Sequence, residues 1–359
     1  SSGMRINTWR TLLAAAALAL AGQVAAQTAA PQPAPATAPA AQEVRENAAQ
    51  PYNNAPLWRE VRSGEPGFTR LGDAPERGVL VQSAGQTWSE LRVPISLLGG
   101  LMVAAAIAAL GGFYAWRGPI KVGETGSGQM IKRFEPKDRY AHWLMGIPWM
   151  ILAVTGLIIT FGKTLLLPIL GGTLYSWLAW FAKNFHNFIG PILIVAVPWM
   201  FIRYLRYNWV DKEDVIWMTK IVGNLTGHEY PSGKFNGGEK MVFCLVLVAL
   251  TSVLIVSGLV LNFPNFGQSR LVMQIASISH MVAAYLAIAT ICVHVYLGTI
   301  GMTGAYRAMR DGYVTNEWAH HHHARWYEDV KAGKVPESPM VPESEVPAPI
   351  RQAVLAADK

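Results

Sequence analysis

Long apolar stretches alternate with short polar segments over most of the chain after residue 92. Each stretch is close to the roughly 20 residues that an α-helix needs to cross the hydrocarbon core of a bilayer. The pattern therefore predicts an all-α integral membrane protein. The expected transmembrane helices are 93–116, 141–161, 185–207, 241–261 and 271–300.

A further apolar stretch, LLLPILGGTLYSWLAWFAKNF at 165–185, separates the second and third expected helices. Pro168 and the Gly171–Gly172 pair interrupt it, and its clustered aromatic residues are typical of a membrane interface. We expect a helix lying along the interface here, because a sixth crossing would invert the orientation of everything downstream.

The first 92 residues have a different pattern. Residues 1–3 precede Met4 and are typical of a cloning remnant, and the basic start, short apolar run and small residues up to Ala26 predict a signal peptide. An Ala/Pro-rich linker is expected at 27–42 and a small exported polar segment at 43–92.

Charge fixes the expected orientation. Only 15% of residues are charged, which is typical of a membrane protein, whereas the net charge of +7 could suggest a nucleic-acid partner. The Lys and Arg residues are instead grouped in three basic segments, at 117–139, at 203–240 and in the tail 307–359, whereas the opposite connections hold one or two each. By the positive-inside rule the basic segments are cytoplasmic, and the N-terminal segment is exported. We therefore expect a membrane partner and no nucleic acid.

Histidines inside the apolar stretches carry the candidate chemistry. The two cysteines, Cys244 and Cys292, form no motif for a disulfide, zinc, iron–sulfur or covalent haem site. An imidazole in hydrocarbon needs partners for its ring nitrogens, so intramembrane histidines are uncommon. The expected spans contain four: His142, His186, His280 and His294.

The expected orientation sorts these histidines into two level pairs. His142 and His294 lie toward the cytoplasmic ends of their helices, and His186 and His280 toward the outer ends. In the last helix the two histidines are fourteen residues apart, so they share one face, about 21 Å apart along the axis. Imidazole at both axial positions of a haem makes an electron carrier rather than an oxygen binder.

We therefore predict a four-helix bundle, 141–306, that holds two b haems and is preceded by one extra helix. Small residues are expected to line the haem faces: Gly156, Gly190, Ala283 and Ala284. The alternatives are a haem-free scaffold whose histidines bond across helices, or a divalent-metal transporter, which should carry midspan carboxylates that these spans lack. The remaining histidines, His228 and His320–His323, are expected to be solvated in a loop and in a basic tail.

Five motifs in order give the chain a family resemblance. They are RFEPKDRYAHW at 133–143, FHNFIGPI at 185–192, KFNGGEKMVF at 234–243, SISHMVAAYLAIATICVHVY at 277–296 and WAHHHHARWYEDV at 318–330. Together they resemble the cytochrome b (gamma) subunit of membrane-bound respiratory formate dehydrogenases. The resemblance covers roughly 133–330. The segment before about Gly118 departs from the short family form.

The resemblance implies that His142 and His294 ligate an inner haem b, and His186 and His280 an outer one. It also implies a quinone pocket beside the inner haem at Asn236 and Gly238, although NGG alone is an ordinary turn. The implied acceptor is menaquinone or ubiquinone. The subunit would relay electrons and reduce quinone without oxidising formate itself.

The implied partners are an iron–sulfur (beta) subunit and a molybdenum- or tungsten-pterin catalytic (alpha) subunit on the outer face of the bacterial inner membrane, in a trimer of heterotrimers. The nearest alternative is the di-haem b subunit of a hydrogenase or of a thiosulfate-type reductase, which shares the bundle and its ligands.

Overall fold

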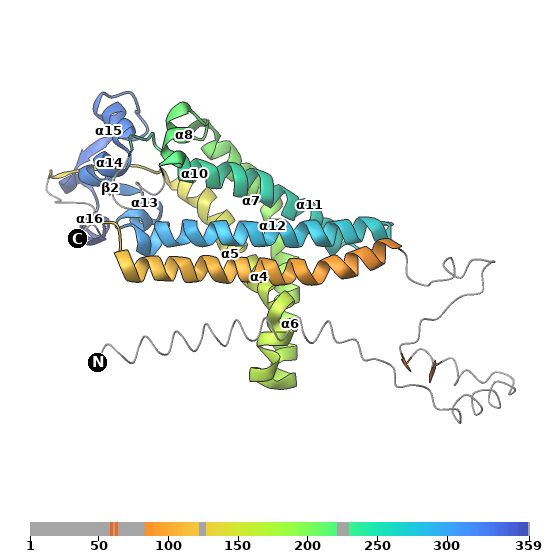
Figure 1. Ribbon diagram of the computed structural model, residues 1–359. Coiled ribbons are helices and arrows are strands. Elements are labelled where there is room, and N and C mark those ends of the chain that lie inside the picture. The colour runs from red at the N-terminus through yellow and green to blue at the C-terminus, as the bar shows by residue number, and fades with distance from the viewer. Residues whose placement is uncertain (1–57, 60–61, 64–82, 122–126, 221–229, 358–359) are drawn as a thin grey trace, which may run out of the picture. The chain divides into compact units, whose positions relative to one another are not determined.

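The computed structural model describes residues 58–59, 62–63, 83–121, 127–220 and 230–357 (Figure 1). The signal-like region, the linker, most of the expected exported segment and His228 lie outside these residues. The chain divides into two compact units, 1–97 and 98–359. The second contains all the candidate site residues.

Helices dominate the described residues, and five of them are long and apolar enough to cross a membrane by length and composition. Each of them contains one of the five predicted spans; the fifth exceeds its prediction by one residue at each end, and the other four are extended further. The all-α prediction is therefore confirmed, and the chain is a multi-pass membrane protein. The five are Gly85–Arg117, Pro136–Leu165, Leu167–Tyr207, Gly237–Asn262 and Arg270–Gly301.

Two of these helices begin with clear local signals. Helix α5 (Pro136–Leu165) has proline in its first turn, where the missing N–H is no loss, and the backbone N–H of Glu135 donates to the Asp138 carboxylate at 3.1 Å. Helix α12 (Arg270–Tyr296) is capped by Ser269, whose hydroxyl accepts from the N–H of Val272 at 3.3 Å. The first of the five spans lies within helix α4 (Ser83–Arg117).

The third helix differs from expectation at its start. It begins at Leu167 rather than near 185 and runs through four consecutive elements. Pro168 falls in the first helical turn and is tolerated there, so only Gly171, with φ +72°, leaves the helical region and kinks the chain. The predicted interruption is thus a kink. The elements are α6 (Leu167–Ile189), η2 (Gly190–Ile192), α7 (Leu193–Tyr204) and η3 (Leu205–Tyr207).

The fourth and fifth spans each contain a π-helical stretch. The fourth comprises α10 (Gly237–Met241), the π-helix η4 (Val242–Leu250) and α11 (Thr251–Asn262). In the fifth, α12 continues into the π-helix η5 (Leu297–Gly301). π-Helical turns are rare in proteins, and those that occur are often near functional sites. Both stretches lie toward the end of the bundle that carries the tail.

A small antiparallel sheet joins the segment before the bundle to the segment after it, and was not predicted. Its strands are β1 (Gln129–Lys132), β2 (Tyr313–Thr315) and β3 (Met340–Pro342), in the order β2-β1-β3. Met130 pairs with Thr315 on one side and with Val341 on the other. The same Met130 side chain packs with Val346 and with Val354 of α16 (Ala348–Ala357), so the tail has its own apolar core.

The three basic segments meet at one end of the bundle, which we call the head (Figure 1). Strand pairing joins the first segment to the tail, and Arg325 of the tail donates to Asp211 of the middle segment at 2.9 Å. The head also contains α8 (Lys212–Thr219), α13 (Ala305–Asp311), α14 (Asn316–His322) and α15 (Ala324–Lys331). Segments predicted to share one side of the membrane are therefore in mutual contact.

Candidate functional site

The predicted inner pair lies at the head end of the bundle. His142 is in the second turn of α5, and His294 is the third residue from the end of α12. Their ring centres are 6.2 Å apart. The Nδ1 atom of His142 is buried and, among the described residues, has no hydrogen-bond partner.

The predicted outer pair has the same separation. His186 is close to the end of α6 and His280 is in the first half of α12, and their ring centres are 6.1 Å apart. Two helices that are remote in sequence therefore bring each pair of rings together, as the depth argument predicts.

Hydroxyl groups fix the outer rings through Nδ1. Thr155 Oγ1 lies 3.0 Å from His186 Nδ1, and Ser257 Oγ lies 2.9 Å from His280 Nδ1. Each hydroxyl also donates to a carbonyl of its own helix, at 2.8 Å and 2.6 Å respectively. Because a hydroxyl has a single proton, its oxygen must accept from the ring, so Nδ1 carries hydrogen and Nε2 keeps its lone pair. That lone pair is the one a metal ion needs.

A glycine follows each of these hydroxyl residues and gives the ring room. A Cβ added at Gly156 would lie 3.3 Å from Cε1 of His186, and one added at Gly258 would lie 3.4 Å from Cε1 of His280. Gly156 and Gly190 were predicted to line haem faces; the structure places the His186 ring beside Gly156, and nothing lies within 4 Å of a Cβ at Gly190. The repeated pair, Thr155–Gly156 and Ser257–Gly258, is a signal that the sequence analysis missed.

The ring separations fit an iron atom between the rings. A metal bonded to two imidazole nitrogens at about 2 Å each places the ring centres about 6 Å apart, close to the 6.2 and 6.1 Å observed. Within the described residues no group of three or more His, Cys, Asp or Glu side chains could hold a metal ion. A zinc site needs three or four protein ligands, whereas a haem iron needs only two because the porphyrin supplies the other four. A pair of imidazoles therefore fits haem iron better than zinc.

Asn236 and Gly238, the predicted quinone residues, form the N-terminal turn of α10. The side-chain oxygen of Asn236 accepts from the N–H of Glu239, and the Glu239 carboxylate accepts from the N–H of Asn236, both at 2.9 Å. This capping box engages the side-chain oxygen of Asn236, whereas the Nδ2 atom of Asn236 makes no hydrogen bond to the described residues. The helix N-terminus is thus ordered while one donor stays available.

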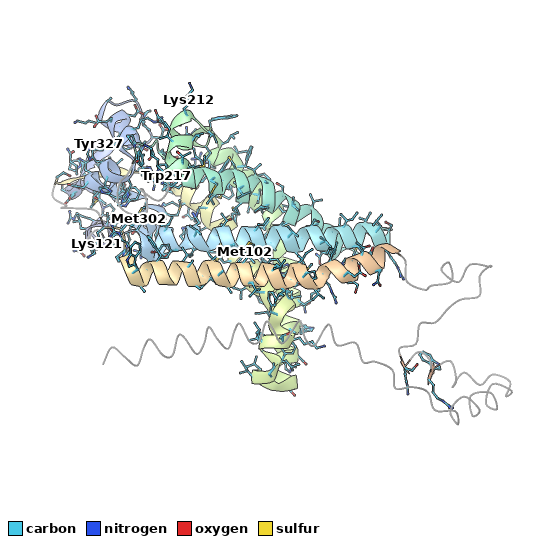
Figure 2. All side chains as sticks on the ribbon, viewed as in Figure 1. Met102, Lys121, Lys212, Trp217, Met302 and Tyr327 are labelled. Carbon is cyan, nitrogen blue, oxygen red and sulfur yellow. The ribbon has the colours of Figure 1, made fainter. Side chains whose placement is uncertain are left out.

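An aromatic ring of the protein itself lies against the glycines. A Cβ added at Gly238 would be 2.8 Å from the Trp217 indole, and one added at Gly237 would be 2.8 Å from the carbonyl oxygen of Asp214. Both neighbours belong to α8, where Figure 2 labels Trp217. The glycines therefore allow α8 to pack closely on α10, a role that the sequence analysis did not predict.

A buried network holds this turn to the tail. One guanidinium nitrogen of Arg133 donates to the carbonyl of Lys234 at 2.8 Å and to Glu239 at 3.1 Å, and lies 2.9 Å from Nε2 of His323. Nδ1 of His323 donates to the carbonyl of Gly233 at 2.8 Å. Burial, and then the Arg133 charge, holds the pKa of His323 well below its usual range, so the ring is neutral and accepts from Arg133.

The His320–His323 run is thus not simply a solvated tail. His322 and His323 are only 4% and 1% exposed, although His320 is exposed. Within the described residues the run forms no metal-binding group.

Replacing Arg133 by methionine is expected to lower the free energy of unfolding by about 1–3 kcal/mol, since the carbonyl of Lys234 and the Nε2 atom of buried His323 lose their donor, whereas Glu239, 30% exposed, stays accessible to water. Arg310, which is 46% exposed in its pair with Asp311, is the control, and its methionine variant should lose no more than about 1 kcal/mol. Denaturant unfolding of the detergent-purified protein measures both. Equal losses would contradict a structural role for the buried network.

Comparison with known proteins points to one family. A family model described as prokaryotic cytochrome b561 matches residues 133–312. The nitrate-inducible formate dehydrogenase cytochrome b556(Fdn) subunit of Escherichia coli strain K12 is 31% identical over 208 residues, covering 56% of this chain and 93% of the relative. The formate dehydrogenase cytochrome b556(fdo) subunit of the same strain is also 31% identical, with the same coverage.

A third relative, the formate dehydrogenase cytochrome b556 subunit of Haemophilus influenzae, is 28% identical over 219 residues, covering 60% of this chain and 89% of the relative. The region matched by the family model contains both histidine pairs and the α10 turn. The first 132 residues and the tail beyond residue 312 lie outside it.

Proposed function

The chain belongs to the prokaryotic cytochrome b561 family, and from that premise we propose that it is the membrane-anchoring di-haem subunit of a formate dehydrogenase. In this proposal it passes electrons from an iron–sulfur subunit through two b haems to quinone on the cytoplasmic side. Haem b, which the family implies, supplies one-electron chemistry when bound.

The observation that carries the proposal is the pair of ring separations, 6.2 Å for His142 and His294 and 6.1 Å for His186 and His280. Two such pairs at different depths suit two redox centres, one near each membrane face. In this proposal the protein orients one imidazole nitrogen of each of the four histidines toward a haem iron. At the outer pair, Thr155 and Ser257 hold the Nδ1 atoms, so the Nε2 atoms are the ones left to bind iron.

The proposed quinone site is at the turn of Asn236 and Gly238. The amide nitrogen of Asn236 can donate to a quinone oxygen, since its oxygen is already engaged in the capping box. Trp217 stands against Gly238, so we assign it to the wall of the site, where an aromatic face can stack on the quinone ring.

Partners and orientation follow as part of the proposal. The relatives are named as subunits of formate dehydrogenases, which supports an iron–sulfur subunit and a molybdenum- or tungsten-pterin catalytic subunit docking on the outer face. The three basic segments gathered in the head support a cytoplasmic C-terminus in the bacterial inner membrane. The cytoplasmic side would then supply the protons for quinone reduction.

The proposal predicts a low-spin, reducible b-type spectrum with two haems per chain in the protein purified from membranes. Copurified catalytic and iron–sulfur subunits should let formate reduce both haems, and added quinone should reoxidise them. Haem extraction, subunit identification and visible spectroscopy make these measurements. Protein that folds without haem would leave the scaffold and transporter alternatives. Reduction by hydrogen or thiosulfate-type donors instead of formate would favour the related complexes.

A further inference from the structure

A buried ion pair lies beside the proposed quinone site. Lys240 Nζ is 2.6 Å from Asp214 Oδ2, and the two side chains are 5% and 4% exposed. Lys240 also donates to the carbonyl of Trp209 at 3.0 Å. A buried pair gives little net stability because desolvation of both charges offsets their attraction. The function described so far makes no use of it.

The pair lies between a cavity and the glycine turn. Lys240 lines a cavity of about 260 Å³ in the head, together with Lys234, Phe235 and residues of the tail. On the other side, the backbone carbonyl of Asp214 meets Gly237, and Trp217 of the same helix meets Gly238. The ion pair thus lies between a cavity that is large enough for several water molecules and the α8–α10 contact, beside the turn where we propose that quinone is reduced.

Several charged groups surround the pair. Asp211 lies 3.7 Å from Lys240 Nζ, and its N–H donates to Asp214 at 2.8 Å. Arg325 bonds Asp211 and also contacts Glu213 on the surface of α8. Among these groups only Lys240 and Asp214 are both buried and in direct contact, so they form the shortest route from the cavity into the α8–α10 contact.

We propose that Lys240 and Asp214 relay protons from the cavity to quinone during its reduction, an inference that rests on the proposed function. Quinone takes up two electrons from the donor subunits and two protons to become quinol. For each proton, the Asp214 carboxyl protonates a quinone oxygen, the Lys240 ammonium returns a proton to the Asp214 carboxylate, and the Lys240 amine is reprotonated through the cavity from the cytoplasmic solution. The balance is one quinone, two electrons from the donor subunits and two protons from that solution, giving one quinol.

The decisive variants are Asp214→Asn and Lys240→Arg in the full complex. Asparagine cannot carry the proton. Arginine keeps the positive charge and can keep the ion pair, but it stays protonated at any accessible pH. Both variants should slow quinone-dependent reoxidation of the reduced haems roughly 100-fold, the usual contribution of a proton-transfer group. Proton uptake, followed with a pH-indicator dye, should slow by the same factor, and a small weak acid should partly restore the rate.

Three measurements separate this relay from a structural role. Two haems per chain and unchanged binding of a redox-inert quinone analogue show that the site is intact. Lys334→Met, at a residue that lines the same cavity but is 69% exposed, should behave like the wild type. Wild-type rates and proton uptake in both decisive variants would overturn the relay and leave the proposed function standing. A wild-type complex that cannot reduce quinone would overturn both.

Discussion

Replacing His294 by alanine is expected to leave one haem per chain and to abolish quinone reduction by formate. The ring of His294 has its partner His142 at 6.2 Å between centres, and removing one of two axial ligands of a buried haem removes most of its binding energy. The proposed outer haem, with its separate pair of histidines, should still be reduced by the proposed donor subunits. Haem extraction and the reduced-minus-oxidised spectrum measure this result.

His186→Ala is the matched experiment at the other pair. It should also leave one haem, but that haem should be reduced by dithionite and reoxidised by quinone, while formate no longer reaches it. His320→Ala, at an exposed residue of the tail, should keep both haems and full activity. Loss of both haems in His294→Ala with the helices intact would contradict the assignment of ligands to two separate pairs.

The histidine pairs could be predicted because the depth and the facing direction of a residue in a transmembrane helix follow largely from its position in the sequence. Once the basic segments set the direction of each span, the position of a histidine in its span gives its depth, and the helical repeat gives its face. The spacing of His280 and His294 therefore determined both quantities from the sequence. The observed contacts with His186 and His142 follow that prediction.

The surroundings of the rings could not be predicted in the same way. Thr155 and Ser257 are each one polar residue in an apolar helix, and such residues usually bond only the preceding turn of their own helix. Their contact with a ring on a neighbouring helix depends on how the helices are rotated about their axes, which the hydrophobic pattern constrains weakly. The resemblance of Thr155–Gly156 to Ser257–Gly258 was the only available signal.

The head was mostly missed for a different reason. Its strands have three or four residues and pair across more than 180 positions of the chain, so no alternating pattern is long enough to recognise. Arg133 and His323 were likewise taken as polar residues of a basic loop and tail. Their burial depends on the tail folding against the α10 turn.

Replacing Gly258 by leucine is expected to remove the outer haem and retain the inner one. A Cβ at this position would lie 3.4 Å from Cε1 of His280, which is ordinary contact, but the branched end of leucine would need the space of the ring or of the haem edge. Haem content should fall from two to one per chain. Electron transfer from formate to quinone should stop, because the outer centre is the proposed entry point.

Two substitutions make this a graded test of space rather than of glycine itself. Gly258→Ala adds only the tolerated Cβ and should keep both haems, whereas Gly156→Ala places its Cβ 3.3 Å from the His186 ring and should weaken haem retention more. Gly298→Leu, where nothing lies within 4 Å of the Cβ, controls for adding leucine to the same bundle. If Gly258→Leu kept both haems, the outer haem could not lie against this glycine, because leucine and a porphyrin edge cannot occupy the same space.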